Sequence, residues 1–410
     1  MLLTGAEVLL QGGSGVLAGL RVGVVANPAS LVRTAEKPWR RLHLVDALES
    51  SGVHVERLFG PEHGLWATAQ DLIAVQGGRD PIFGREVATL YGRTVNSLTL
   101  APQALDGLDA VVFDVQDVGS RYYTYFATLC MAIDTCAARG VPVFVLDRPN
   151  PLGGEVVEGN SVQPRFKSFV SWLDLPQRHG LTLGEIARLY LSEAGLDPHC
   201  VQVIPCQGYD TSLYFDEQSW GPAGSPWYAP SPNMPTVQTA VVYPGGCLIE
   251  GTLLSEGRGT TRPFELIGAP WLDARRYAAD VEAMGIAGLA VRPMCFEPTF
   301  QKYTRQVCHG VAVEVTDRRQ FAAVQSGVAL IAAARHQNPE LFEWRTEVYE
   351  FVSDRLAIDL LMGGEHCRTA LEAGGSIAQA TADFAAAELA FAARAQPHLL
   401  YPRRSGLFAV

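Results

Sequence analysis

The sequence predicts an α/β protein in which a Rossmann-like domain, built on a parallel sheet, precedes a smaller α+β auxiliary domain. Segments of strand length in the first half are almost entirely apolar, as in 110–114, and such strands are typical of parallel sheets covered on both faces. They alternate with segments of helical periodicity. The 410 residues also exceed a typical single core. We therefore expect the Rossmann-like domain at 1–205, a crossing rich in Pro, Gly and aromatic residues at 206–235, and the auxiliary domain at 236–410.

Composition excludes several classes of protein and partner. Apolar residues make up 48% and charged residues 18%, which is typical of a well-buried globular protein. The formal net charge of -11 argues against nucleic acid and anionic membrane surfaces as partners. No apolar run approaches the ~18 residues of a membrane span. The first residues lack the features of a signal peptide, so we expect a cytoplasmic protein, with export as the alternative if the sequence has been trimmed. The eight scattered cysteines, without a C-x-x-C pair, are expected to be reduced core residues.

The expected elements follow from hydrophobic periodicity and from turn and cap signals. Thr182 and Glu185 have the spacing of a capping box at the start of a helix. In the first domain we expect strands at 21–27, 53–59, 87–91, 110–114, 141–147 and 201–204, and helices at 39–50, 122–139 and 183–194. In the second we expect strands at 239–243 and 311–315, and helices at 320–336, 355–362 and 377–394. Neither a dinucleotide fingerprint nor a P-loop is present, so no nucleotide cofactor is predicted.

Three polar loops follow strands of the predicted sheet. The carboxyl ends of parallel strands lie along one edge, so these loops should converge in one crevice. The candidate side chains are Glu62 and His63 in the first loop, Asp114, Gln116, Asp117, Arg121, Tyr123 and Tyr125 in the second, and Asp147, Arg148 and Asn150 in the third. Structural alternatives exist for each loop: Asp117 is also suited to cap a helix, and Asp147 with Arg148 to form a buried ion pair.

Carboxylates, amides and aromatic rings without a metal or nucleophile motif suit a sugar site. Glycosidic cleavage needs an acid for the leaving oxygen and a second group that supports the positively charged carbon. Glu62 is the expected acid, because the adjacent Leu65 and Trp66 would reduce its hydration and favour the protonated form. Asp114 or Asp117 is the expected partner. A metal held by Glu62, His63 and Asp114 is the less favoured alternative, because adjacent side chains usually point apart.

Several long motifs occur in an order that resembles the NamZ-type exo-β-N-acetylmuramidases, a family of peptidoglycan hexosaminidases. The resemblance covers nearly the whole chain. The motifs are Phe59-Gly-Pro-Glu-His-Gly-Leu65, Leu90-Tyr-Gly92, Phe113-Asp-Val-Gln-Asp-Val-Gly-Ser-Arg-Tyr-Tyr-Thr-Tyr125, Leu146-Asp-Arg-Pro-Asn-Pro-Leu-Gly-Gly154, Arg178-His-Gly-Leu-Thr-Leu-Gly-Glu185, Ser231-Pro-Asn-Met-Pro-Thr236 and Glu250-Gly-Thr-Leu-Leu-Ser-Glu-Gly-Arg-Gly-Thr-Thr-Arg-Pro-Phe264.

The resemblance implies a glycoside hydrolase of cell wall recycling. Members release N-acetylmuramic acid from the non-reducing end of glycan fragments, and the family's catalytic glutamate corresponds to Glu62. The chain departs from the family at Leu65–Asp71, where members often have Leu-Arg-Gly and a further glycine, which leaves the exact substrate open. Another exo-acting amino-sugar hydrolase and a non-catalytic muropeptide-binding protein are the alternatives. The second catalytic group is Asp114, Asp117 or the substrate's own 2-acetamido group.

The second half of the chain is expected to complete the site through Asn233, Glu256 and Arg258. N-acetylmuramic acid carries a lactyl carboxylate, which an arginine can grip with two hydrogen bonds. The four candidate arginines for this role are Arg121, Arg148, Arg258 and Arg262. The expected ligand is thus a small carbohydrate or muropeptide, with no nicotinamide, flavin or metal.

Overall fold

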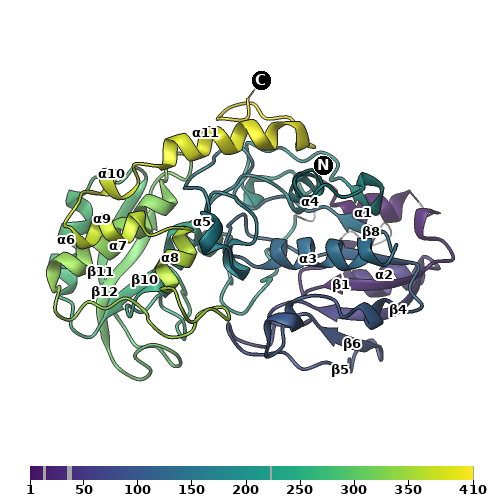
Figure 1. Cartoon of the computed structure of the whole chain (residues 1–410), viewed down its shortest axis with the longest axis horizontal. Coiled ribbons are helices and arrows are strands. Elements are labelled where there is room, and N and C mark those ends of the chain that lie inside the picture. The colour runs from purple at the N-terminus through teal and green to yellow at the C-terminus, as the bar shows by residue number, and fades with distance from the viewer. Residues whose placement is uncertain (13–14, 35–38, 222–223, 410) are drawn as a thin grey trace.

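A computed structural model of the chain describes residues 1–12, 15–34, 39–221 and 224–409. It has two lobes: the first half of the chain forms one, and the second half forms most of the other (Figure 1). A mostly parallel sheet forms the centre of the first lobe, and a smaller antiparallel sheet lies in the second. The predicted fold class is confirmed.

The large sheet has seven strands in the order β5-β6-β4-β1-β7-β8-β9. All neighbouring strands are parallel except β5, which runs antiparallel to β6 at the edge. The chain runs outward on one side of β1 through β4 and β6, and then returns to the other side at β7. This reversal is a topological switch point, where α/β proteins bind ligands beyond the carboxyl ends of the strands. The strands are β1 (Arg21–Ala26), β4 (His54–Gly60), β5 (Gly78–Arg79), β6 (Glu86–Thr89), β7 (Ala110–Asp114), β8 (Val143–Leu146) and β9 (Val201–Ile204).

Helices cover both faces of this sheet, which is why its central strands are apolar on both sides. Helices α1 (Gly5–Gln11) and α2 (Leu44–Ser50) pack on one face with Val24 and Val112. Helices α3 (Tyr125–Ala138) and α4 (Leu183–Ala194) pack on the other face with Val111.

The second lobe contains a three-stranded antiparallel sheet in the order β10-β12-β11. Helix α6 packs on β11 and β12, while α7 packs on α5 and α6. Its elements are α5 (Val237–Gly246), β10 (Leu266–Ala269), α6 (Ala274–Ala283), β11 (Leu289–Phe296), β12 (Cys308–Val315), α7 (Ala323–Gln337), α8 (Ala357–Met362), α9 (His366–Glu372), α10 (Ile377–Ala380) and α11 (Phe384–Ala395).

Three of the predicted elements are wrong in type or extent. The strand expected at 239–243 lies inside α5, which begins at a Thr236 cap and is buried almost all round. A helix buried on every side has no polar face, and its apolar run therefore resembles a buried strand. The helix expected at 39–50 begins only at Leu44, because Arg41–His43 (β3) pairs with Leu31–Arg33 (β2). The helix expected at 377–394 is interrupted between α10 and α11.

The last residues of the chain return to the first lobe. Yellow α11 crosses between the lobes in Figure 1, and the C-terminus lies beyond it. The Tyr401 hydroxyl then donates a 2.6 Å hydrogen bond to Asp147, and Arg403 forms a buried 2.7 Å ion pair with Glu185. The first lobe is thus held by residues from both ends of the sequence.

The structure also bears on the expected lack of a membrane span and on the state of the cysteines. Among the described residues, no helix combines the length and the apolar composition needed to cross a membrane. All eight cysteines are free, and six of them are buried, including Cys130, Cys136 and Cys247. The expected core position holds for these six, whereas Cys295 is exposed and Cys200 only partly buried, and the reduced state stays a prediction.

Candidate active site

A tight turn after β4 holds Glu62. The Gly64 amide donates a 2.8 Å hydrogen bond to the Pro61 carbonyl, and both His63 (φ 68°) and Gly64 (φ 82°) adopt the left-handed conformation. This conformation is unfavourable for His63, and strain of this kind often marks functional turns. The turn buries Glu62 to 5% exposure. Its carboxylate accepts a 2.5 Å hydrogen bond from the Thr124 hydroxyl, just before α3.

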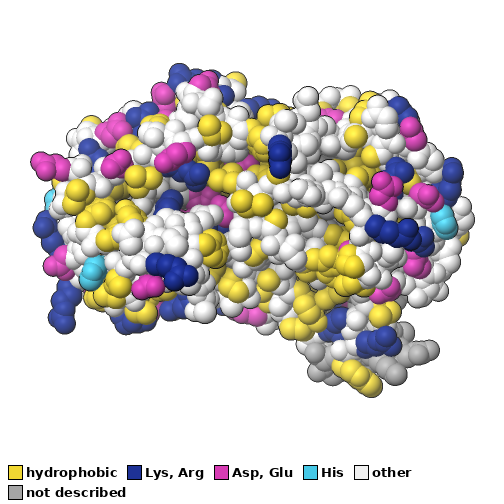
Figure 2. Space-filling view, turned by 90° about the horizontal axis from the view of Figure 1, so that it is seen from below, with side chains coloured by type: hydrophobic (Ala, Val, Ile, Leu, Met, Phe, Trp, Pro, Cys, Tyr) yellow, Lys and Arg dark blue, Asp and Glu magenta, His cyan; other side chains and the backbone are white. Residues whose placement is uncertain are grey.

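Glu62 faces a pocket that both lobes line. About 480 Å³ of space here, including the part that opens to solvent, is free of protein atoms. Acidic side chains are visible in the hollowed middle of the molecule, between the two lobes (Figure 2). The lining residues are Glu62, His63, Asp71, Tyr122, Tyr123, Thr124, Tyr125, Val170, Ser231, Asn233, Met234, Tyr243, Glu250, Arg258, Phe264, Tyr349 and Glu350. The site is therefore concave, aromatic and rich in carboxyl groups.

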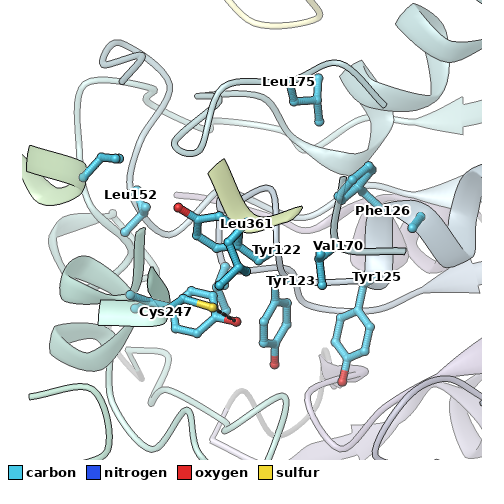
Figure 3. Close-up of a cluster of buried hydrophobic side chains, with 14 of the residues drawn as sticks. Tyr122, Tyr123, Tyr125, Phe126, Leu152, Val170, Leu175, Cys247 and Leu361 are labelled. Carbon is cyan, nitrogen blue, oxygen red and sulfur yellow. Dashed lines mark hydrogen bonds between the residues drawn. The ribbon is translucent and has the colours of Figure 1, made fainter. Parts of the chain in front are cut away.

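Tyrosines form one wall of this pocket. The rings of Tyr123 and Tyr125 pack edge to face with centroids 4.8 Å apart, and Tyr123 packs in the same way on Tyr243. Their side chains point the same way, with the hydroxyl groups at the ends away from Phe126 (Figure 3). The Tyr125 hydroxyl donates to the Pro230 carbonyl at 2.8 Å, which ties the wall to the crossing segment. Flat apolar rings with polar tips suit a sugar ring and its hydroxyl groups.

A buried arginine and three carboxylates lie in or beside the pocket. Arg258 is 3.1 Å from Asp71, 2.6 Å from Glu250 and 3.3 Å from Glu256. Burial raises the pKa of Asp71, but the charge of Arg258 and a hydrogen bond from Gln301 outweigh it, and the net shift is downward. The predicted Glu256 does not line the pocket directly; it supports Arg258 and also pairs with Lys302 at 2.9 Å.

A carboxyl group that the sequence motifs did not indicate, Glu350, lies in the pocket lining with Glu62. It is 7% exposed and accepts a 3.1 Å hydrogen bond from the Tyr91 hydroxyl. Burial, and next the charge of Glu62, raises the pKa of Glu350 well above its usual value. It lies in the connection between α7 and α8, in a turn at residues 349–352 that contains neither glycine nor proline, so no local turn signal points to it.

Asp114 and Asp117, the predicted partners of Glu62, are absent from the residues that line this pocket. Asp114 is fully buried and receives two hydrogen bonds from Arg148, at 2.5 and 2.9 Å. Asp117 accepts from the Gly119 amide at 2.7 Å and lies 4.0 Å from His179. Burial raises the pKa of Asp117 to about 7. A catalytic role of either stays a prediction, and their hydrogen bonds give each a structural function.

Most of the other predicted residues at the sheet edge make structural contacts. Asp147 accepts from Thr182, the Gly184 amide and Tyr401, which joins α4 to the C-terminal tail. The Asn150 side chain donates to the Leu181 carbonyl and accepts from the Leu152 amide.

Arg121 does not line the pocket either. Its guanidinium is fully buried and donates to the carbonyls of Asn160, Leu175 and Leu361 at 2.6–2.8 Å. Arg262 is partly exposed and pairs with Glu265 at 2.9 Å.

Two predicted residues face a separate, neighbouring pocket. Gln116 and Arg148 line it together with Trp227 and Tyr228 of the crossing segment. The Gln116 amide group donates to the carbonyls of Asp117 and Pro149. Glu62 is absent from the lining of this second pocket, so Gln116 and Arg148 line a different cavity from the one that holds Glu62.

Five of the predicted residues do come together around Glu62: His63, Tyr123, Tyr125, Asn233 and Arg258. The Asn233 amide donates a 2.6 Å hydrogen bond to Gln70, and His63 Nδ1 lies 2.9 Å from the Ala69 carbonyl. Across the described part of the chain, no three His, Cys, Asp or Glu side chains form a group suited to a metal ion.

Comparison with known proteins identifies the family. The model for "Exo-beta-N-acetylmuramidase NamZ, N-terminal" matches residues 22–238, and that for "Exo-beta-N-acetylmuramidase NamZ, C-terminal" matches residues 241–401. The chain belongs to the NamZ family. The resemblance drawn from the motifs is confirmed, and the two NamZ models meet near residue 240, whereas the boundaries at 205 and 235 stay predictions.

One NamZ relative and two solved structures are similar to most of the chain. The peptidoglycan beta-N-acetylmuramidase NamZ of Bacillus subtilis (strain 168) is 39% identical over 375 residues, or 91% of this chain and 85% of that relative. Two DUF1343 family proteins from Bacteroides fragilis NCTC 9343 have solved structures with TM-scores of 0.81 and 0.73, at 28% and 26% identity. Each comparison covers 98% of this chain and 99% of the other.

Proposed function

We propose that this protein is a glycoside hydrolase that removes terminal, non-reducing β-N-acetylmuramic acid from peptidoglycan fragments. The observation that carries the proposal is Glu62, a buried carboxyl held by a strained turn in a tyrosine-walled pocket at the switch point of the sheet. Membership of the NamZ family and the printed activity of the Bacillus subtilis relative support it.

In this proposal Glu62 is the general acid. It gives its proton to the glycosidic oxygen as the bond to C1 breaks, a role that typically contributes ~10²–10⁴-fold to the rate. The Thr124 hydroxyl fixes the orientation of the carboxyl group. Tyr123 and Tyr125 supply faces and hydroxyl groups for the sugar.

Arg258 is the candidate partner of the lactyl carboxylate, because it alone among the four predicted arginines lines the pocket. Three carboxylates already surround it, so the substrate must compete for its donors or approach it after Asp71 has moved. We therefore expect Arg258→Ala to reduce turnover of a muramide more than that of a glucosaminide. If Arg258→Ala reduced turnover of both substrates equally, Arg258 would have a structural role in the site and not a role in binding the lactyl carboxylate.

The experiment that tests the function compares purified wild-type protein on a chromogenic β-N-acetylmuramide and on the matching β-N-acetylglucosaminide. Product analysis on peptidoglycan glycan fragments accompanies it. Faster turnover of the muramide and release of single N-acetylmuramic acid residues support the proposal. Turnover of the glucosaminide alone would indicate another amino-sugar hydrolase, and binding without turnover would indicate a muropeptide-binding protein.

We also propose a cytoplasmic location, supported by the eight unpaired cysteines, because disulfides are rare in reducing compartments. Fractionation of the native cells tests it, and recovery of the protein outside the cytoplasm would contradict it.

A further inference from the structure

The pocket holds four carboxyl groups, and they divide into two kinds. Asp71 and Glu250 each contact Arg258, which offsets their charge. In the part of the chain that the structure describes, neither Glu62 nor Glu350 forms an ion pair with a cation. Removing a carboxylate from water without a cation is costly, and burial raises the pKa of Glu350, with the charge of Glu62 as the next cause.

Glu350 lies in a turn whose backbone conformation is itself unfavourable. Both Glu350 (φ 45°) and Phe351 (φ 67°) are left-handed, in a turn closed by hydrogen bonds of 3.0 and 2.9 Å between Tyr349 and Val352. Two consecutive non-glycine residues in this conformation are rare. The Tyr349 hydroxyl donates to Glu250 at 2.7 Å, and the Tyr91 hydroxyl donates to Glu350 at 3.1 Å. Hydrogen bonds on both sides thus fix the turn beside the carboxyl groups.

We propose that Glu350, contributed by the second lobe, is the second catalytic carboxyl group, and that it shares one proton with Glu62. The inference rests on the proposed function. It gives the partner role to a residue that faces the same pocket as Glu62, whereas Asp114 is held by Arg148. It also explains why an uncompensated carboxyl group and a strained turn occur together at this place.

The shared proton fits the chemistry of glycoside hydrolysis. Before the substrate binds, the proton lies on Glu350, whose pKa is raised by burial and by the charge of Glu62. It passes to Glu62, which gives it to the departing oxygen as the electrons of the C1–O bond pass to that oxygen. Glu350, ionised by this transfer, faces the electron-poor C1 and the nucleophile that attacks it. Water supplies the hydroxyl group that ends on C1, and its remaining proton returns the pair to one proton. One water is consumed, and both carboxyl groups are regenerated.

The test compares Glu350→Gln with wild type and with Glu347→Gln, a matched change in the same connection whose side chain is 65% exposed. The measurements are kcat and KM on an unactivated muramic acid disaccharide, the pH dependence of kcat, and the thermal unfolding temperature. Glu350→Ala is assayed with and without added formate, which can replace a missing carboxylate. We expect Glu350→Gln to remain folded, to lose at least ~10²-fold in kcat and to lose one limb of the pH profile. Formate should raise kcat of Glu350→Ala, and Glu347→Gln should match wild type.

Two results would overturn the inference. One is Glu350→Gln with kcat near that of wild type. The other is a loss in which both pH limbs persist and formate restores nothing, since that is the behaviour of a structural residue. If wild type cleaves a different amino-sugar glycoside, the same variants are compared on that substrate. If wild type cleaves none, the proposed function and this inference both fail, whereas an active wild type with an unaffected Glu350→Gln removes only the inference.

Discussion

At the scale of single residues, the hydroxyl of Thr124 determines how Glu62 is presented. Glu62 is almost fully buried, and its carboxyl group accepts a short hydrogen bond from that hydroxyl. Hydrogen bonds to charged groups are worth about 1.5–3 kcal/mol, and breaking one leaves the carboxyl group free to rotate. We expect Thr124→Val to lower kcat by roughly 10- to 100-fold with a small change in KM, by the conversion of about 1.4 kcal/mol per decade.

Thr128→Val is the matched control for this measurement. Thr128 lies one turn later in α3, and its hydroxyl donates to the Thr124 carbonyl instead of to Glu62. Its kcat should equal that of wild type. If both threonine variants lost activity equally, the effect would belong to α3 and not to the Glu62 hydrogen bond.

Glu350 gives a second prediction at this scale, on stability against pH. Its folded pKa is raised by burial and by Glu62, with Asp71 and Glu250 also facing it and Tyr91 donating a hydrogen bond. An unfolded glutamate titrates near pH ~4.3, so the contribution of Glu350 is fully present below that pH and is lost as pH rises through the folded pKa. We expect Glu350→Gln, which cannot ionise, to unfold at a higher temperature than wild type at pH 8, with the gap shrinking toward pH 4. A constant gap across this range would show that Glu350 is not buried as a neutral acid.

At the scale of elements, the turn after β4 that holds Glu62, at residues 61–64, depends on Gly64. A Cβ at Gly64 would meet a Val75 methyl at 3.2 Å, and its φ of 82° strains any L side chain. Left-handed backbone costs an alanine roughly 1–2 kcal/mol. We expect Gly64→Ala to lower both the unfolding temperature and kcat, because the strain acts on the turn that positions Glu62.

Gly52→Ala is the control that separates the effect of backbone strain on stability from its effect on catalysis. Gly52 also has φ 82°, but nothing lies within 4 Å of its added Cβ, and it precedes β4 at the far end of the strand. We expect a similar loss of stability with normal kcat. If Gly64→Ala also kept the kcat of wild type, the prediction would be wrong. The turn that holds Glu62 would then tolerate strain without an effect on catalysis.

The sequence patterns predicted the first lobe well, because its signals are local. Strands with apolar runs and the Thr182–Glu185 capping box lie where they were expected, and α4 has the predicted bounds. The second lobe was harder. Helix α5 carries β-branched residues and Pro244, and it is a helix because of its packing on α7, where Gly245 and Gly327 meet. That contact joins residues far apart in sequence, so no local pattern predicts it.

The same reason limited prediction of the site. From loop position after a strand, we predicted that Glu62, His63, Tyr123 and Tyr125 lie in one crevice, and all four line the same pocket. Loop position could not separate pocket residues from structural ones. Asp147 and Arg121 also lie in loops that follow strands, but their side chains make buried hydrogen bonds within the fold. Loop position also could not identify a pocket residue such as Glu350, which comes from the second lobe and lies in no motif.

At the scale of the whole molecule, the two lobes and the C-terminal tail depend on one another. Arg403 and Glu185 form an ion pair whose side chains are 1% and 0% exposed. Removing one partner of a buried pair leaves an uncompensated charge and typically costs about 3–5 kcal/mol. We expect Arg403→Ala to lower the free energy of unfolding by an amount of that order.

Arg404→Ala is the control, because the Arg404 side chain is 72% exposed in its ion pair with Asp210. Exposed pairs contribute about 0–1 kcal/mol, so its unfolding curve should lie close to that of wild type. Equal stability of the two variants would show that the tail does not hold the first lobe together.

The most direct test of the account is the turnover of an unactivated muramic acid disaccharide by wild type and by Glu62→Gln. The control is Glu56→Gln, on the same strand β4 with a 44% exposed side chain. If Glu62 is the general acid of a muramidase, wild type and Glu56→Gln release N-acetylmuramic acid at similar rates. Glu62→Gln should then remain folded and turn over at least ~10²-fold more slowly. Near-normal release by folded Glu62→Gln would contradict the account.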